Sequence, residues 1–252
     1  MKATEVYQQY LIHLADDALI LGQRLAEWCG HGPVLEEDIA LANISLDCVG
    51  QATLLYKEAA RLDAQGRDED AIALTRLEHE YSNLLLLELP KGDFAFTIAR
   101  QFFYATYFEK YLQLLTQSKD EFISSFAAKA LKEVAYHCKH ARQWVLRLGD
   151  GTEESHQRMQ AGIDACWDFV GEMFDVDAVE QSMIDQGILA SKKDLHDAWL
   201  DDVRACIQEA TLKIPTTVSF QRGGRTGRHT EHMGFLLSEL QYMQRAYPGA
   251  KW

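Results

Sequence analysis

Two helix-like segments each carry a carboxylate at a position from which it could reach a metal. Asp47 is followed three residues later by Gly50 in SLDCVGQA, and Glu133 is followed three residues later by Tyr136 in LKEVAYHC. A di-iron site inside a helical bundle uses a Glu-x-x-His pair on each of two helices, with a further acid from each of the other two. Both acids are present here, but both histidines of the pattern are missing. The spacing therefore indicates a metal site that has been partly lost.

Few other residues could complete such a site. His137 and His140 follow the second acid at i+4 and i+7, and Asp17 flanks an apolar seam near the N-terminus, whereas we expect Asp16 to point further away. One residue turns a helix by about 100 degrees, so His137 cannot simply replace a histidine one position earlier. An i, i+4 pair can nevertheless bind metal. We expect a satisfied polar network of the acids and His137, with a bound metal as the alternative.

The segment that should supply the third acid offers little. Glu109 is the single acidic residue of the stretch from 94 to 116, and Tyr104 or Ala105 stands at the depth where the acid is expected. Partners for the two remaining carboxylates could come from basic or hydroxyl side chains elsewhere, namely Arg24, Arg100, Lys132 or Tyr136.

Two further groups of polar residues could bind a ligand. A His-x-Glu-His run begins at His229, but no second cluster with zinc spacing accompanies it, so we expect the run to open the last helix. Arg222, Arg225 and Arg228 alternate with glycines in QRGGRTGR. Guanidinium groups and glycine amides suit a phosphate. A flexible solvent-exposed loop or a subunit contact is the interpretation that we prefer.

Long amphipathic segments must position these side chains. Apolar residues recur at helical spacing from Tyr7 to Trp28, from Ile39 to about Leu62, from about Phe94 to Thr116, and from a capping box at 118–121 to Gly149. The second segment has its expected buried seam at Ile39, Ala42, Leu46, Val49, Thr53 and Tyr56. A shorter helix is expected at 69–87, and more helices near 153–174, 191–212 and 229–247, with an extended linker at 214–218.

These elements predict an all-α fold. Four long helices with short or moderate connections are typical of a ferritin-like four-helix bundle. We expect a single domain over residues 1–252, with a core bundle at about 4–149 and a C-terminal helical extension at about 150–252. The aromatic surface of the helix at 94–116 and the C-terminal helices are the expected subunit interface.

The composition narrows the possible functions. The formal net charge of -13 argues against binding to a nucleic-acid backbone and favours a partner with a basic patch. The five cysteines are scattered and lack any C-x-x-C spacing, which is typical of reduced thiols in a cytoplasmic protein. Acids and polar residues interrupt the apolar stripe of the first segment, so we expect neither a signal peptide nor a membrane span there.

Several blocks of the sequence resemble the PaaC family of bacterial phenylacetyl-CoA epoxidase subunits, nearly end to end. These blocks are LGQRLAEWCGHGP, LALANISLDCVGQA, EYSNLLLLELPKGDFAFTIARQFF, KEVAYHCKHARQWVLRLGDGT and GRHTEHMGFLLSELQYMQRAYPG. The resemblance implies a ferritin-like fold and a soluble complex that forms the ring-1,2-epoxide of phenylacetyl-CoA in aerobic phenylacetate catabolism. It also implies three partners: PaaA, which carries the di-iron site and binds the CoA ester, the small bridging subunit PaaB, and the reductase PaaE, which uses NADPH, FAD and an iron–sulfur centre.

The resemblance and the residues lead to the same expectation. No catalytic, cofactor-binding or metal-binding residue can be carried over, so we predict a non-catalytic structural subunit that pairs with the di-iron subunit and holds no cofactor. One alternative is a metal-dependent oxygenase that uses Glu133, His137, Asp47 and Asp17. The other is a CoA-ester binding module that uses the loop at 222–228.

Overall fold

The computed structural model describes residues 3–216 and 219–250, and every regular element in these ranges is a helix. The predicted all-α class is confirmed, and the chain has a ferritin-like helical fold. Contacts divide the chain into two compact units, which we call unit 1 (residues 1–90 and 222–252) and unit 2 (residues 91–221). This division differs from the expected one near residue 149, because the last segment of the chain packs with the first helices. That residues 1–252 form a single domain stays a prediction.

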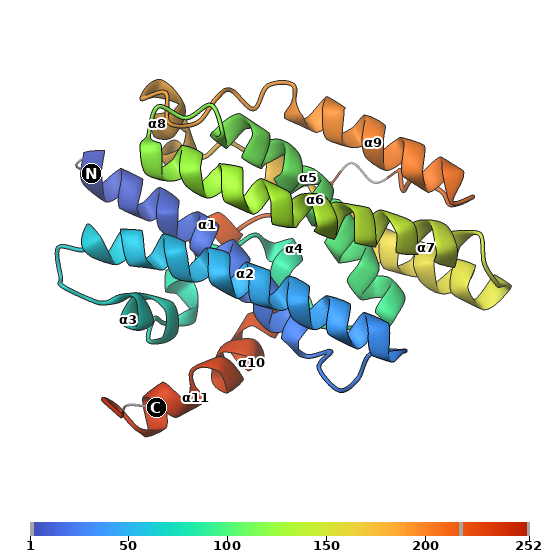
Figure 1. The fold of residues 1–252 in the computed structure, drawn as a ribbon, viewed down its shortest axis with the longest axis horizontal. Helices are drawn as coiled ribbons and strands as arrows, with labels where there is room; N and C mark the ends of the chain where they lie inside the picture. Colours follow the sequence, from blue (N-terminus) through green and yellow to red (C-terminus); the bar gives the residue numbers. More distant parts are fainter. Residues whose placement is uncertain (1–2, 217–218, 251–252) are drawn as a thin grey trace. The chain divides into compact units, whose positions relative to one another are not determined.

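Unit 1 is built on a pair of antiparallel helices, α1 (Ala3–Ala26) and α2 (Leu35–Arg61). Figure 1 shows them in blue, joined by a short turn. Gly32 belongs to this turn because its amide donates to Asp38 Oδ2 at 3.0 Å, and a Cβ on Gly32 would lie 2.7 Å from the backbone of Asp38. The turn predicted from the glycines is therefore confirmed.

The seam predicted for α2 is wrong at most of its positions, since Tyr56 is the one of its six residues that is buried. Leu46 is 67% exposed and Ile39 is 52% exposed, whereas a second apolar stripe of the same helix is buried, formed by Leu41, Ile44, Cys48, Ala52, Leu55 and Ala59. Ser45 explains why this second stripe faces α1, because its hydroxyl donates to the Gly22 carbonyl of α1 at 2.8 Å. Gly22 has no side chain, so this face of α2 can approach α1 closely.

The segment after α2 is not the single helix predicted at 69–87. It consists of α3 (Glu69–Leu74), the 3-10 turn η1 (Glu78–Glu80) and the single-turn α4 (Leu85–Glu88). Between η1 and α4 the backbone amides of Ser82 and Leu84 donate to carboxylates of α1 at 2.8 Å each. Because these amides point at side chains of α1, they cannot join a continuous helical ladder.

The end of the chain completes unit 1. It comprises the 3-10 turn η3 (Gly224–Thr226), α10 (Glu231–Leu240) and α11 (Tyr242–Ala246), which together replace the single helix predicted at 229–247. Figure 1 shows α10 and α11, in red, extending away from the α1–α2 pair. Of the predicted linker at 214–218, Thr217 and Val218 lie outside the described residues.

Unit 2 is built on α5 (Phe94–Leu115) and α6 (Glu121–Gly149), against which α7 (Glu153–Trp167) and α9 (Leu195–Glu209) pack. Asp120 caps α6 by accepting the amide of Ile123 at 2.9 Å, close to the predicted start. The short elements η2 (Gly171–Phe174) and α8 (Ala178–Asp185) connect α7 to α9. The helix predicted at 153–174 therefore ends earlier, and the one predicted at 191–212 is shorter.

The aromatic side chains of α5 form the core of unit 2 and not an exposed interface. Six of them are buried, namely Phe102, Phe103, Tyr104, Tyr107, Phe108 and Tyr111, whereas Phe94 and Phe96, at the start of the helix, are only partly buried. Phe103 packs edge-on against Trp167, and the indole N–H of Trp199 donates to the Phe103 carbonyl at 3.0 Å. The prediction that this surface of α5 forms a subunit interface is therefore wrong. Side chains of α7 and α9 pack against it from within the same unit.

Candidate functional site

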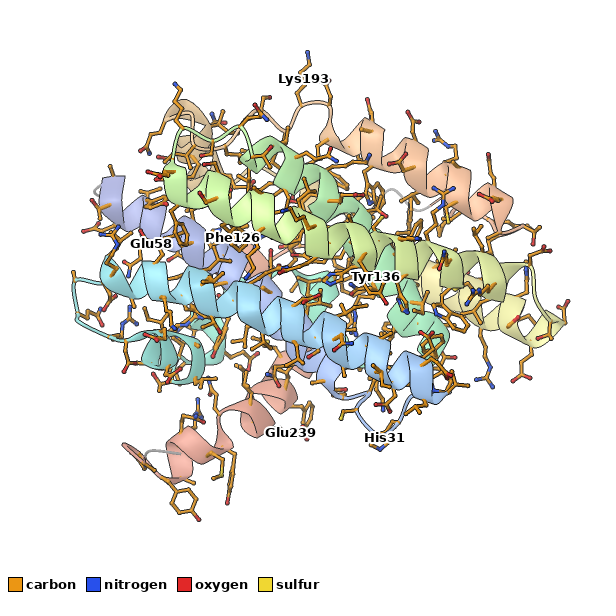
Figure 2. All side chains as sticks on the ribbon, in the orientation of Figure 1. His31, Glu58, Phe126, Tyr136, Lys193 and Glu239 are labelled. Atoms are coloured by element: carbon orange, nitrogen blue, oxygen red, sulfur yellow. The ribbon has the colours of Figure 1, made fainter. Side chains whose placement is uncertain are left out.

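None of the four positions predicted for the two lost Glu-x-x-His pairs is fully buried. Gly50 is exposed and Tyr136, labelled on α6 in Figure 2, is 51% exposed, whereas Asp47 and Glu133 are only partly buried. A ligand inside a bundle must stand on the buried side of its helix. The positions predicted for the two lost histidines therefore lie on outward faces.

The buried faces carry a different pair at the same i, i+3 spacing. On α2 the pair is Cys48 and Gln51, and on α6 it is Val134 and His137, all buried. Neither pair has a carboxylate at its first position, and the pair on α6 has a histidine at its second. The position expected for the third acid also has no carboxylate. The buried residues at this depth of α5 are Tyr104 and Ala105, and the acid of this helix, Glu109, is only partly buried. Within residues 3–216 and 219–250 no group of three or more His, Cys, Asp or Glu side chains is arranged to hold a metal ion.

Asp16 is a buried residue of unit 1, contrary to the expectation that it points away. Its exposed fraction is 0%, since α1 is buried on all its sides around this position. Arg76 forms an ion pair with both oxygens of Asp16, and the Tyr56 hydroxyl donates to Oδ1 at 2.5 Å. The amide and the hydroxyl of Ser82 donate to Oδ2 at 2.8 and 3.0 Å. Both carboxylate oxygens of Asp16 are thus engaged.

Asp17 is neutralised by the glycine-flanked Arg225. Arg225 Nη1 donates to Asp17 Oδ1 at 3.0 Å and Nη2 donates to Oδ2 at 2.7 Å, while the amide of Leu84 donates to Oδ1 at 2.8 Å. Arg225 Nη1 also donates to the carbonyl of Ser82 at 2.6 Å. Both terminal nitrogens of the guanidinium therefore donate to acceptors inside unit 1, and the phosphate contact considered for Arg225 stays a prediction.

The backbone of the basic loop around Arg225 lies close to the segment from η1 to α4. A Cβ on Gly224 would lie 2.0 Å from the carbonyl oxygen of Asn83, and one on Gly227 would lie 2.1 Å from that of His79. Gly227 also has a φ of +73°, in the left-handed region that favours glycine. These glycines let the loop backbone touch the segment before α4. The side chains of Arg222 and Arg228 are exposed.

Glu88 is a further buried acid of unit 1, and it contacts His229, the residue that the sequence suggested as a possible metal ligand. His229 Nδ1 lies 2.7 Å from Glu88 Oε2, and His229 Nε2 lies 3.0 Å from the carbonyl oxygen of Tyr81. The amide of Thr230 donates to Glu88 Oε1 at 2.5 Å, and the Asn83 amide group donates to Oε2 at 2.8 Å. His229 thus joins the start of α10 to α4, and both of its ring nitrogens have partners.

Arg24 also contacts this part of unit 1 and not the degenerate metal positions for which it was considered. Its Nε and Nη2 donate to the Glu88 carbonyl at 3.0 and 2.7 Å, and its Nη1 lies 2.7 Å from Glu27 Oε1. We call the residues Asp16, Asp17, Arg24, Tyr56, Arg76, Glu88, Arg225 and His229 the polar core of unit 1.

The polar core shifts several pKa values. Burial raises the pKa of Asp17 to about 6, against the opposing effect of Arg225. Burial, helped by the charges of Arg225 and Arg76, holds the pKa of His13 well below 6.5, so His13 is neutral. Burial alone would lower the pKa of His229, but its hydrogen bond to Glu88 and the Glu88 charge outweigh burial and raise it. The cluster is thus arranged for ion pairing.

This arrangement does not suit a metal. Asp16 and Asp17 each accept hydrogen bonds on both carboxylate oxygens and face an arginine, and a cation would have to displace that guanidinium against its charge. Arg76 and Glu88 could not be identified from the sequence, because ion pairs between distant segments do not produce a pattern of local residue spacing. The one signal available was the glycine spacing around Arg225.

Apolar side chains are exposed on two parts of unit 1. On α2 they form a stripe of Leu35, Ile39, Leu46 and Leu54. On α10 and α11 they are Phe235, Tyr242 and Met243, with Tyr247 just after α11. Among the described helices, α2 alone is long and apolar enough to cross a membrane, and 44% of its most apolar stretch is buried. A helix in the core of a soluble protein can be equally long and apolar. Contiguous exposed apolar surface is typical of a site that binds a partner.

Comparison with known proteins identifies relatives of this chain. The sequence model of the family described as "Phenylacetic acid catabolic protein" matches residues 1–252. The C component of the 1,2-phenylacetyl-CoA epoxidase of Escherichia coli (strain K12) is 46% identical to this chain over 243 residues, which cover 96% of this chain and 98% of that protein.

Proposed function

This chain belongs to the phenylacetic acid catabolic protein family, and from that premise we propose that it is the non-catalytic structural subunit of a phenylacetyl-CoA epoxidase. In this proposal it pairs with the di-iron subunit PaaA, while PaaB bridges the assembly. PaaE delivers electrons from NADPH through FAD and an iron–sulfur centre. This chain holds no cofactor itself, and it acts in the cytoplasm, where phenylacetyl-CoA is consumed.

The observation that carries the proposal is the ion pairing of the two buried acids of α1, Asp16 and Asp17. Asp16 faces Arg76 and Asp17 faces Arg225, so each negative charge is already balanced by a side chain of the same unit. A di-iron site needs carboxylates whose charge balances the metal instead. The arginines thus stabilise a bundle that has no metal to hold its acids together.

The exposed stripe of α2 supports the pairing. Leu46 and Ile39 are apolar side chains on the outer face of a long helix whose other face packs on α1. Covering such a stripe with a partner helix removes apolar surface from water, at about 25 cal/mol per Å². A rigid sister subunit can also hold the ligand-bearing helices of a catalytic subunit in place, because metal ligands must keep their geometry closely.

The test is to produce the catalytic subunit with and without this chain. We expect the catalytic subunit alone to be less soluble and less active, and the pair to elute together in size-exclusion chromatography. Addition of this chain to a preparation of the catalytic subunit should restore epoxidation of phenylacetyl-CoA. A catalytic subunit that is soluble and fully active without this chain would contradict the proposal.

A further inference from the structure

A groove of unit 1 has features of a protein-binding site beyond the stripe of α2. It is a cavity of about 320 Å³ between α1, α2, α3 and the α10–α11 segment. Its apolar lining includes Leu19, Val49, Leu74 and Leu240. Pockets that enclose a drug-sized ligand measure about 300–1,000 Å³, so this groove suits an anchoring side chain better than a whole acyl-CoA.

The rim of the groove is acidic. Glu69 and Asp70, in the first turn of α3, line it, and no Lys, Arg or His belongs to the described lining. Lys57 approaches Glu69 only to 4.0 Å, and both side chains are more than a third exposed, so this contact neutralises the rim weakly.

The wall formed by α10 and α11 is held in place. Gln241, at the junction of the two helices, is fully buried, and its Nε2 donates to the Arg76 carbonyl at 2.8 Å and to the Tyr81 hydroxyl at 2.9 Å. None of the described residues of α11 is buried, although Tyr242 and Met243 are apolar. The groove thus keeps its shape while its outer wall presents uncovered apolar side chains.

We infer that this groove binds a cationic amphipathic segment of another subunit of the complex, with an apolar side chain in the cavity and Lys or Arg side chains against Glu69 and Asp70. The inference rests on the proposed function and specifies the partner. The apolar floor and the acidic rim together select for a segment of that composition, since complementary charge fixes the orientation of an apolar contact.

Charge separates this occupant from others. A second copy of this chain carries a net charge of -13 and would bring acids to an acidic rim. Anionic lipid headgroups and the phosphates of a CoA ester would meet the same repulsion. A cationic amphipathic segment is attracted by the acidic rim and also places an apolar side chain in the cavity.

Site-specific photo-crosslinking in the assembled complex tests the inference. Thr53, an exposed residue in the lining of the groove, is replaced by p-benzoylphenylalanine, and Gln157, an exposed residue of α7 in unit 2, receives the same replacement as the control. We expect the Thr53 probe to crosslink an apolar peptide of another subunit flanked by Lys or Arg, and the Gln157 probe not to label that peptide. An intact complex with no crosslink at Thr53, or with a crosslink to this chain or to an acidic segment, would overturn the inference.

A charge variant gives a second readout. E69Q/D70N should weaken the affinity of this chain for the other subunits roughly tenfold at low salt and less at high salt. The matched control, E153Q/E154Q, makes the same change of charge on exposed acids of unit 2 and should leave the affinity unchanged. Equal effects of the two variants would overturn the inference and leave the proposed function intact. Failure of the unmodified chain to join the complex would overturn both.

Discussion

Asp17 and Arg225 are 208 positions apart in the sequence and form a two-bond ion pair, with Nη1 3.0 Å from Oδ1 and Nη2 2.7 Å from Oδ2. The pair ties the last segment of the chain to the middle of α1. Glu88 and His229 tie the same segment to α4. Because both links are buried, the end of the chain is an integral part of unit 1.

Removal of Arg225 should destabilise unit 1 strongly. R225A leaves the buried Asp17 carboxylate without its cation, which costs about 3–5 kcal/mol for a buried pair. Thermal unfolding followed by circular dichroism should therefore show a clear drop in Tm. R228A is the matched control, because Arg228 is an exposed arginine of the same loop, and it should change Tm little. Similar Tm values for the two variants would show that the Asp17 contact does not stabilise the unit.

The helical architecture could be predicted from the sequence because it depends on local signals. The apolar spacing of α1 and the glycine turn after it act within a few residues. The capping box predicted at 118–121 is wrong in detail, because Asp120 and not Ser118 caps α6. The buried face of α2 could not be predicted in the same way. The stripe with Leu46 and the stripe with Cys48 both have helical spacing, and only the close approach of α2 to Gly22 decides between them.

The polar core was not predictable for a related reason. Asp16 and Asp17 are neighbours, so a single apolar seam on α1 suggests that one of them faces water. Since α1 is buried on all sides there, both acids need partners, and Arg76 and Arg225 come from segments far along the chain. The faces of α2 and α6 that were expected to point inward were chosen from Asp47 and Glu133, which are only partly buried.

The Glu88–His229 pair should make stability depend on pH. The folded-state pKa of His229 lies above its ordinary value of 6.5, so its contribution to stability is complete below that value and is lost as the pH rises through the raised pKa. Asp17 acts in the same direction at lower pH, because its pKa is raised from 3.8 to about 6 and stability falls as the pH rises through that range.

Denaturant unfolding between about pH 6 and pH 8.5 can isolate the histidine. The unmodified chain should lose stability as the pH rises over this range. H229Q should be less stable at the acidic end and should show a flatter profile, because glutamine carries no titrating charge. Parallel profiles of the two proteins would contradict the assigned pairing.

A buried triad in unit 2 offers a test by double mutation. Lys192 Nζ lies 2.8 Å from Glu180 Oε2, and the Tyr111 hydroxyl donates to Glu180 Oε1 at 2.9 Å. K192M should cost about 3–5 kcal/mol because it leaves a buried carboxylate uncompensated. The double variant E180Q/K192M should recover part of that loss, since neither charge remains. Additive losses in chemical denaturation would show that the two side chains do not interact.

The exposed stripe of α2 should be needed for pairing and not for folding. L46E places a charge in a surface that we propose to be covered by the catalytic subunit, so co-purification should fall while the free energy of unfolding changes by less than about 1 kcal/mol. V176E is the control, because Val176 is an exposed apolar residue of unit 2. Equal co-purification of both variants would remove this stripe from the interface.

Iron analysis tests the central claim most directly. The purified chain, produced with iron supplied, is analysed for metal and compared with the co-purified pair. We predict less than about a tenth of an equivalent of iron in the chain alone and about two equivalents in the pair, since a carboxylate-bridged site holds two ions. About two equivalents in the isolated chain would contradict the account, because its own residues would then form the metal site.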